Sequence, residues 1–367
     1  MMRKLVAAVT VAGLLGGTAT VAEAKPSGKA ALQEQLDALV GPFPAALASV
    51  SRGGRTESLV AGSARLGSRV PVPVDGRVRA GSNTKTFTAV VVLQLVAEGK
   101  VALDAPIERY LPGLVPGGSA ITVRQLLQHT SGLPNYTEYL GLEDVAKLRH
   151  RYFEPHELLA VAFAHPAKFA PGTKWEYSNT NYVLAGLLVQ RVTGRPVAEE
   201  ITSRVIRKAG LRNTYWPAAG DEGIRGPHPQ GYARSGGEVV DVTELDPSWG
   251  WAAGQLISTP GDLARFSRAL LDGRLLPAAQ LAEMRKTVDA PLAPGWRYGL
   301  GLFRVPLSCG GEYWGHGGDI HGFETRGGAT DDGRAVGLAV TALPGTFGDG
   351  DQGAQAVLSA VDAAFCR

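Results

Sequence analysis

The tetrad Ser82-Asn-Thr-Lys85 begins a long apolar run, residues 87–96, that stops at Gly99. Such a run is typical of a buried helix that ends at a glycine. Residues three apart share a helix face, so Ser82 and Lys85 should point the same way at the N-terminus of this helix. A serine hydroxyl needs a base to become a nucleophile. A lysine can be that base where burial and the positive helix end lower its pKa, so the tetrad predicts a reactive serine.

Two further motifs strengthen the prediction of a reactive serine. On its own, the tetrad also fits an ordinary surface serine and lysine. Tyr177-Ser-Asn179 lies near the middle of the chain, and His316-Gly-Gly318 lies near its C-terminus. In this order the three motifs resemble those of the penicillin-recognising serine hydrolases, the family of serine β-lactamases and penicillin-binding proteins. The likeness is strongest to the class C β-lactamase branch and its Streptomyces-type D-alanyl-D-alanine carboxypeptidases. It extends over nearly the whole chain after residue 24 and includes three flanking segments, 122–132, 170–172 and 253–259.

The resemblance implies an acyl-transfer site built from these motifs. Ser82 would attack a carbonyl, Lys85 would accept its proton, and Tyr177 would pass a proton to the departing nitrogen. A phenol acts as a base only where nearby positive charge lowers its pKa, and a half-buried structural tyrosine is the alternative. The backbone N–H groups of Ser82 and Asp319 would bind the developing oxyanion.

Asn179 and the glycine motif are expected to bind substrate. By resemblance, the Asn179 amide binds the substrate's amide carbonyl and touches Lys85, although a turn residue also fits the pattern. His316 stands where many β-lactamases carry a lysine, and its imidazole would hydrogen-bond Tyr177 or supply charge. A lone histidine is more often structural. Gly318 lies on a predicted edge strand, where a small residue lets the substrate backbone approach.

The residues that set specificity depart from the family pattern. In related carboxypeptidases, a tryptophan in the segment that corresponds to the residues before Ala253 lines the pocket for the terminal D-alanine. Trp249 is our candidate and Trp251 its competitor, and a buried core aromatic is the alternative. These carboxypeptidases also carry hydroxyl groups in the third motif and an arginine shortly before the first cysteine. Arg304 is the candidate for that arginine, but the sequence does not fix the register of this segment. Here Asp319 adds a negative charge, which would repel a substrate carboxylate and attract an ammonium.

Cys309 and Cys366 are the two cysteines of the sequence, and we expect them to form a disulfide. An even pair in an exported protein favours a disulfide, and related carboxypeptidases carry a matching pair. Two unpaired buried thiols are the alternative. The bond would tie a C-terminal amphipathic helix to a strand beside His316, and that helix should pack on the sheet next to the first helix.

The N-terminus has the features of a secretory signal peptide. Arg3 and Lys4 precede an apolar stretch that is too short to span a membrane, and Ala22-Glu-Ala24 offers a cleavage site after about Ala24. We therefore expect an extracytoplasmic, secreted protein with no membrane span.

The remaining sequence predicts an α/β (α+β) protein in which helices flank an antiparallel sheet and an all-helical lobe is inserted. Residues 25–35 are polar and read as a loose leader into a first helix, and Gly53-Gly54 marks a hairpin between two strands. We expect the signal peptide in 1–24, the first part of the α/β lobe in 25–110, the helical lobe in 111–244 and the second part of the α/β lobe in 245–367.

Charge and composition exclude several classes of partner. The formal net charge is +3 and the basic residues form no cluster, which argues against nucleic acid. No Cys/His group has the spacing of a metal site, so we predict neither a metal nor a cofactor. The expected partners are small peptides such as peptidoglycan stems, and β-lactams, and we expect a monomer.

Two conspicuous motifs receive no catalytic role. His129 suggests a Ser-His-Asp triad, but the sequence lacks a Gly-x-Ser-x-Gly elbow, and the resemblance makes this segment a structural turn. Asn135-Tyr-Thr137 matches a glycosylation acceptor, for which we expect no function here.

The sequence thus favours an exported serine hydrolase that works through an acyl-enzyme, with D-alanyl-D-alanine carboxypeptidase as the leading activity. A D-aminopeptidase or D-amino-acid amidase, with Asp319 binding the free amine, is one alternative, and an esterase is another. A non-catalytic penicillin-binding protein is the alternative from a different class, but such proteins usually lose the serine or the lysine.

Overall fold

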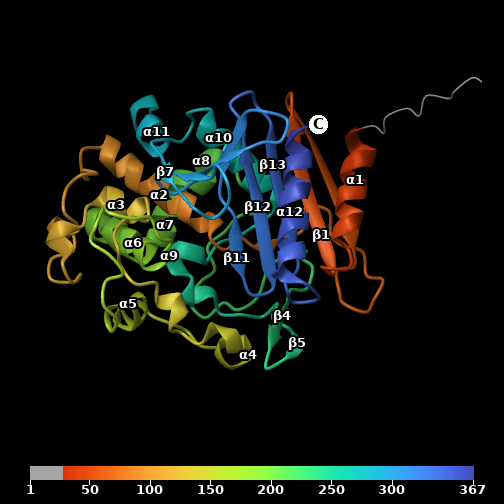
Figure 1. Cartoon of the computed structure of the whole chain (residues 1–367), viewed down its shortest axis with the longest axis horizontal. Coiled ribbons are helices and arrows are strands. Elements are labelled where there is room, and N and C mark those ends of the chain that lie inside the picture. Colours follow the sequence, from red (N-terminus) through yellow and green to blue (C-terminus); the bar gives the residue numbers. More distant parts are fainter. Residues whose placement is uncertain (1–27) are drawn as a thin grey trace, which may run out of the picture.

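The computed structural model describes residues 28–367, and at its centre lies a nine-stranded antiparallel sheet (Figure 1). The strands follow the order β2-β1-β13-β12-β10-β9-β8-β7, and β11 pairs with β12 as well. Strands from both ends of the described chain therefore build one sheet. Their bounds are β1 Ala45–Arg52, β2 Arg55–Gly62, β7 Val288–Asp289, β8 Arg297–Tyr298, β9 Phe303–Pro306, β10 Glu312–Gly315, β11 Gly318–Ile320, β12 Phe323–Ala329 and β13 Ala335–Val340.

Helices cover both faces of this sheet. On one face α1 (Gly28–Leu39) lies beside α12 (Gly350–Phe365), as Figure 1 shows; α1 packs on β1 and β2, and α12 packs on β12 and β13. The buried face of α12 includes Val357, Val361 and Phe365. This confirms the amphipathic helix predicted for the C-terminal segment. On the other face, α10 (Pro260–Leu271) packs against β12 and β13.

The central helix of the other half of the molecule is α2 (Asn83–Ala97), which has buried side chains at every position from Thr84 to Leu95. A helix that is apolar on all sides must be surrounded by protein. The helices of this half are α3 Val123–Leu127, α4 Val145–Leu148, α5 Pro155–Phe163, α6 Thr180–Thr193, α7 Val197–Ile201, α8 Arg207–Ala209, α9 Trp251–Gly254 and α11 Ala278–Met284.

The glycine predicted to end α2 does so. Gly99 has φ +70°, its N–H donates to Val96 O, and the N–H of Lys100 donates to Leu95 O. This is the hydrogen-bond pattern of a Schellman cap, in which a residue with positive φ closes the last turn.

Three other predictions on the fold can be compared with the structure. The hairpin around Gly53-Gly54 is confirmed as β1 and β2. The loose leader in 25–35 is wrong from Gly28 onward, because Leu32, Leu36 and Leu39 recur at helical spacing and are buried against the sheet.

The segment 111–244 is not all helical, because β4 (Tyr232–Ser235) and β5 (Glu238–Asp241) form a hairpin around Gly236-Gly237. Both glycines have positive φ, which a tight turn of this kind uses. The boundaries 110/111 and 244/245 stay predictions, and the predicted signal peptide lies outside the described residues.

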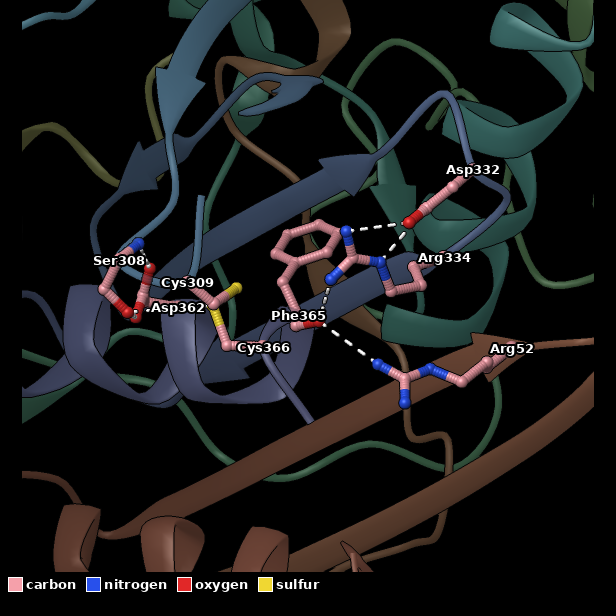
Figure 2. The surroundings of a disulfide bond; sticks show 8 residues. All are labelled: Arg52, Ser308, Cys309, Asp332, Arg334, Asp362, Phe365 and Cys366. Atoms are coloured by element: carbon pink, nitrogen blue, oxygen red, sulfur yellow. Dashed lines mark hydrogen bonds and ion pairs between the residues drawn. A yellow bond between two sulfur atoms is a disulfide. The ribbon is translucent and has the colours of Figure 1, made fainter. Parts of the chain in front are cut away.

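A disulfide between Cys309 and Cys366 fixes the C-terminal end of α12 (Figure 2), as predicted, with the two Cα atoms 5.6 Å apart. Beside it, Asp362 Oδ1 accepts a hydrogen bond of 2.8 Å from the N–H of Ser308. The carbonyl of Phe365 accepts hydrogen bonds from Arg52, the last residue of β1, and from Arg334, which immediately precedes β13. The end of the helix is thus fixed both covalently and by polar contacts.

Within residues 28–367, no helix is long and apolar enough to cross a lipid bilayer.

Candidate active site

The three sequence motifs meet at one cavity of about 460 Å³ between the sheet and the helical half. Ser82 is the N-cap residue of α2, Tyr177 and Asn179 lie in the loop before α6, and His316 follows β10. All four side chains line the cavity, together with Asp319 of β11. The serine hydroxyl does not cap its own helix. It is therefore free to interact with Lys85.

Lys85 is fully buried (0% exposed), and its Nζ makes three contacts. Asn179 Oδ1 lies at 2.7 Å, Ala253 O at 2.8 Å and Ser82 Oγ at 2.9 Å. Burial lowers the lysine pKa well below its ordinary value, with a smaller opposing effect from Asp319. This favours the neutral amine, which has two N–H bonds and one lone pair.

The three contacts of Lys85 fix the direction of that lone pair. The oxygens of Asn179 and Ala253 can only accept, so they take both N–H bonds. The lone pair then faces the Ser82 hydroxyl, which is the only one of the three partners that can donate. Lys85 is therefore oriented to accept the serine proton, the arrangement that nucleophilic catalysis needs.

Asn179 is itself held by the Asn135-x-Thr137 motif, for which we expected no function. Its backbone N–H donates to Asn135 Oδ1 at 3.0 Å, and its Nδ2 lies 3.3 Å from Asn135 Oδ1 and 3.2 Å from Thr137 Oγ1. These contacts turn Oδ1 toward Lys85. The Asn135-x-Thr137 pattern was visible in the sequence, but its partner Asn179, 44 residues after Asn135, was not.

Tyr177 is half-buried and lines the same cavity as Ser82. Burial raises its pKa above the ordinary value, and its interaction with Ser82 opposes this only in part. Lys85 and His316 do not supply the positive charge that a phenolate base requires, because burial favours their neutral forms, and the charge of Arg326 lowers the pKa of Tyr177 less than burial raises it. Tyr177 therefore fits the role of a proton donor and relay, as the sequence suggested for the departing nitrogen.

His316 makes contacts other than those expected. Its Nδ1 lies 2.5 Å from the carbonyl of Gly317, which can only accept, so Nδ1 carries the hydrogen. Its Nε2 then accepts from the hydroxyl of Tyr298 at 3.1 Å. Burial, with a further effect of Lys85, lowers the pKa of His316 to about 3. The ring is therefore neutral, and both nitrogens are used by groups other than Tyr177, whose ring centre lies 6.2 Å away.

Two glycines bring the strand wall against the start of α2. A Cβ on Gly318 would lie 1.9 Å from the carbonyl oxygen of Ala80, and a Cβ on Gly81 would lie 2.9 Å from the backbone nitrogen of Asp319. Gly81 also has φ +49°. Only residues without a side chain allow this approach, which places the backbone nitrogen of Asp319 against Gly81, the residue before Ser82. The oxyanion hole expected at the N–H groups of Ser82 and Asp319 stays a prediction that this close approach favours.

The two candidate tryptophans differ in position. Trp249 lines a small cavity beside Ser82 and Asp319, and its ring packs edge-on against His321. Trp251 points into the helical half, where its ring lies so close to Gly186 that a Cβ there would be 2.7 Å away. Of the two, Trp249 is the one that can contact a substrate.

Asp319 belongs to a cluster of charges that the sequence did not reveal. It stands directly opposite Glu324 in the β11–β12 ladder, and Arg326 Nη2 lies 2.8 Å from Asp319 Oδ1 and 2.9 Å from Glu324 Oε1. Burial raises the pKa of Glu324 to about 7, with Arg326 opposing and Asp319 adding to this effect. One guanidinium thus serves two carboxyl groups, of which Asp319 is half exposed (53%) and Glu324 is buried (1%).

The rest of the cavity is mainly apolar. Arg304, the candidate for a carboxylate-binding arginine, pairs with Glu312 and does not line the cavity. Among residues 28–367, no group of His, Cys, Asp and Glu side chains is arranged to hold a metal ion. The apolar lining comes from the sheet, from α12 and from the loop before β8, and comprises Leu292, Trp296, Phe303, Val305, Tyr313, Ala354 and Leu358.

The fold and this serine–lysine–tyrosine site define a serine hydrolase. The family model described as Beta-lactamase matches residues 32–362, and the chain belongs to that family.

Solved structures of similar proteins include a D-stereospecific amidohydrolase from Streptomyces sp., which is 42% identical, with a TM-score of 0.82 over 90% of this chain and 98% of that one. The D-amino acid amidase of Ochrobactrum anthropi SV3 is 28% identical, with a TM-score of 0.79 over 92% of this chain and 99% of that one. A putative penicillin-binding protein, PbpX of Bacillus subtilis (strain 168), is 28% identical over 65% of this chain. The match spans 55% of the length of that relative.

Proposed function

We propose that this protein hydrolyses amides of D-amino acids that carry a free α-amino group. The observation that carries the proposal is Asp319, a half-exposed carboxylate on the strand that borders Ser82. The similarity to a D-stereospecific amidohydrolase over nearly the full length of both chains supports it. The carboxypeptidase activity favoured by the sequence alone becomes the second candidate.

The charges at the site support an ammonium ligand over a carboxylate. Arg326 is already shared between Asp319 and Glu324, so it does not offer an uncommitted guanidinium fork to a substrate carboxylate. Lys85 and His316 favour neutral forms. The acidic groups are therefore incompletely balanced, and a substrate ammonium beside Asp319 would restore the balance.

The chemistry follows from the contacts of Ser82. As Oγ attacks the acyl carbon, its proton passes to Lys85, and the oxyanion forms before the N–H groups of Ser82 and Asp319. The C–N bond then breaks while Tyr177 gives a proton to the leaving nitrogen, and the proton held by Lys85 replaces it. Water attacks the acyl-enzyme next, its proton passes to Lys85, and Ser82 takes that proton as its ester bond breaks. The products are the free D-amino acid and ammonia or an amine.

The apolar lining provides room for the side chain of the acyl group. Trp296, Phe303 and Leu358 are among the residues that form this wall. Burial of an aromatic or branched side chain there stabilises the complex by about 1.5–3 kcal/mol. We therefore propose D-phenylalanine amide as a suitable test substrate.

The direct experiment compares the release of ammonia from D-phenylalanine amide with that from its L-enantiomer, and with release of D-alanine from an N-acylated D-Ala-D-Ala peptide. Ser82→Ala serves as the inactive control. Turnover of the D-amide alone supports the proposal. Turnover of the peptide with no action on the amide would establish the carboxypeptidase instead.

A matched variant tests the role of the carboxylate. Asp319→Asn keeps the backbone N–H and the size of the side chain but removes its charge. We expect its kcat/KM for D-phenylalanine amide to fall by about 10–100-fold, as for loss of a charge-assisted contact. The fall should be much smaller for the N-acetylated amide, which has no ammonium. An equal fall for both substrates would exclude Asp319 as the ammonium ligand.

We also propose that the protein acts outside the cytoplasm. The disulfide between Cys309 and Cys366 supports this, because such bonds persist mainly in oxidising compartments. Detection of the protein in the culture medium of its source cells, with an N-terminus near residue 25, would test it.

A further inference from the structure

His129 lies behind the catalytic tyrosine and is fully buried (0% exposed). It follows α3 in a conformation with φ +61°, which is uncommon for a residue other than glycine. Its ring centre lies 4.3 Å from that of Tyr177, 4.9 Å from that of Tyr298 and 5.3 Å from that of Tyr182. The histidine is thus enclosed by aromatic rings, with no contact to Ser82 given by the structure.

The polar contacts of His129 lie on either side of Tyr177 in the chain. The backbone N–H of Glu176 donates to the carbonyl of His129 at 3.0 Å, and that of Ser178 donates to its Nδ1 at 3.2 Å. A single residue therefore holds the backbone both before and after the tyrosine. Because backbone position sets where a phenol hydroxyl can reach, these two bonds help to determine the place of the Tyr177 hydroxyl at Ser82.

A third contact fixes the protonation state of the ring. Asn181 Nδ2 lies 3.1 Å from His129 Nδ1, and Asn181 Oδ1 accepts from Ser131 Oγ at 2.6 Å, which sets the orientation of the amide. Nδ1 therefore accepts from two N–H groups and carries no hydrogen of its own. The hydrogen lies on Nε2, which has no hydrogen-bond partner among residues 28–367. Such a ring acts as a rigid acceptor and has no site for proton exchange with substrate.

We propose that His129 is a positioning residue for Tyr177, needed for the step in which Tyr177 protonates the leaving nitrogen. The proposal rests on the proposed amide hydrolysis. His129 should have little influence on the cleavage rate of an activated ester, because p-nitrophenolate departs without a proton. A residue that merely held the fold together would affect both substrates alike.

The test compares two substrates with one acyl group, D-phenylalanine amide and the p-nitrophenyl ester of D-phenylalanine. For His129→Ala we expect kcat on the amide to fall about 30-fold or more, part of the contribution of a general acid, with KM changed less than about threefold. The loss on the ester should be at least about tenfold smaller. His129→Asn tolerates positive φ and offers an amide oxygen near the position of Nδ1, so it should recover much of the amide activity.

A double-variant cycle gives an independent readout. In a Tyr177→Phe background there is no phenol to position, so His129→Ala should cost less than about threefold on the amide. Equal losses on amide and ester, or full additivity with Tyr177→Phe, would overturn the proposal. If circular dichroism shows that His129→Ala does not fold, His129→Asn replaces it in the test, alone and combined with Tyr177→Phe. Equal losses of His129→Asn on amide and ester, or full additivity with Tyr177→Phe, would then overturn the proposal.

Failure of the proposed function is distinguishable from failure of this inference. A wild-type protein that ignores D-phenylalanine amide but cleaves an N-acylated D-Ala-D-Ala peptide refutes the proposed function only. The same variants are then compared on that peptide and on the depsipeptide whose scissile nitrogen is replaced by oxygen. A loss confined to the peptide would support the role of His129, and equal losses would refute it.

Discussion

Gly318→Ala should abolish most of the activity without unfolding the protein. A Cβ at this position would lie 1.9 Å from the carbonyl oxygen of Ala80, whereas ordinary contacts begin at 3.4 Å. The obstacle is backbone rather than the end of a flexible side chain, so β11 must move by about 1.5 Å. That displacement carries the N–H of Asp319 away from Ser82.

The cost follows from the role of that N–H. An oxyanion donor acts only within about 2.7–3.1 Å of the developing charge, and loss of one donor lowers kcat by about 10²–10³-fold, or about 2.7–4 kcal/mol. We expect this loss in the steady-state turnover of D-phenylalanine amide, with a much smaller change in KM because the ground-state substrate carries no oxyanion.

A second glycine provides the matched control. A Cβ on Gly223 would meet no atom within 4 Å and its φ is not positive, so Gly223→Ala should keep wild-type kcat. Circular dichroism and thermal melting of both variants would show whether they fold. A folded Gly318→Ala protein with kcat within about threefold of the wild type would refute the oxyanion role of β11.

Three further results are expected. Lys85→Met and Lys85→Arg should both lose at least about 10³-fold in kcat, because the methionine sulfur is not basic and the arginine guanidinium stays protonated, so neither can accept the serine proton; comparable activity in Lys85→Arg would exclude the neutral-amine role. Because the pKa of His316 falls from 6.5 to about 3 on folding, the unfolded chain binds one more proton below pH 6.5. Acid should therefore destabilise the protein, with His316 contributing about 1.4 kcal/mol per pH unit between those values, and His316→Asn should show a shallower slope in urea unfolding between pH 6.5 and 4.5. Replacing Cys309 and Cys366 by alanine should lower the free energy of unfolding by about 4 kcal/mol in the chain-entropy model, because they lie 57 residues apart; an unchanged urea midpoint would contradict this.

Local patterns allowed much of the site to be predicted. The apolar run after Lys85 leaves no polar face, so only a buried helix with Ser82 at its start accounts for it. Gly53-Gly54 marks a turn with positive φ in the same local way.

The missed features depend on contacts between distant residues. Glu324 and Arg326 join Asp319 only through the pairing of β11 with β12. Register between strands is set by burial and turn geometry across the whole sheet, and short polar stretches specify it weakly. The contact between Tyr298 and His316 was missed for a similar reason. It depends on the pairing of β8 with β9 and of β9 with β10. The charge of Asp319 was visible in the sequence, but the guanidinium that partly balances it was not.

The most direct measurement is the ratio of kcat/KM for D-phenylalanine amide to that for its N-acetylated form, with the wild-type protein at pH 7.5. The two substrates share the scissile bond and the side chain and differ only in the ammonium that Asp319 would bind. We expect the free amine to be preferred by about 100-fold or more, consistent with a charge-assisted contact in a partly buried site. A ratio near or below one would contradict an ammonium-binding site beside Ser82.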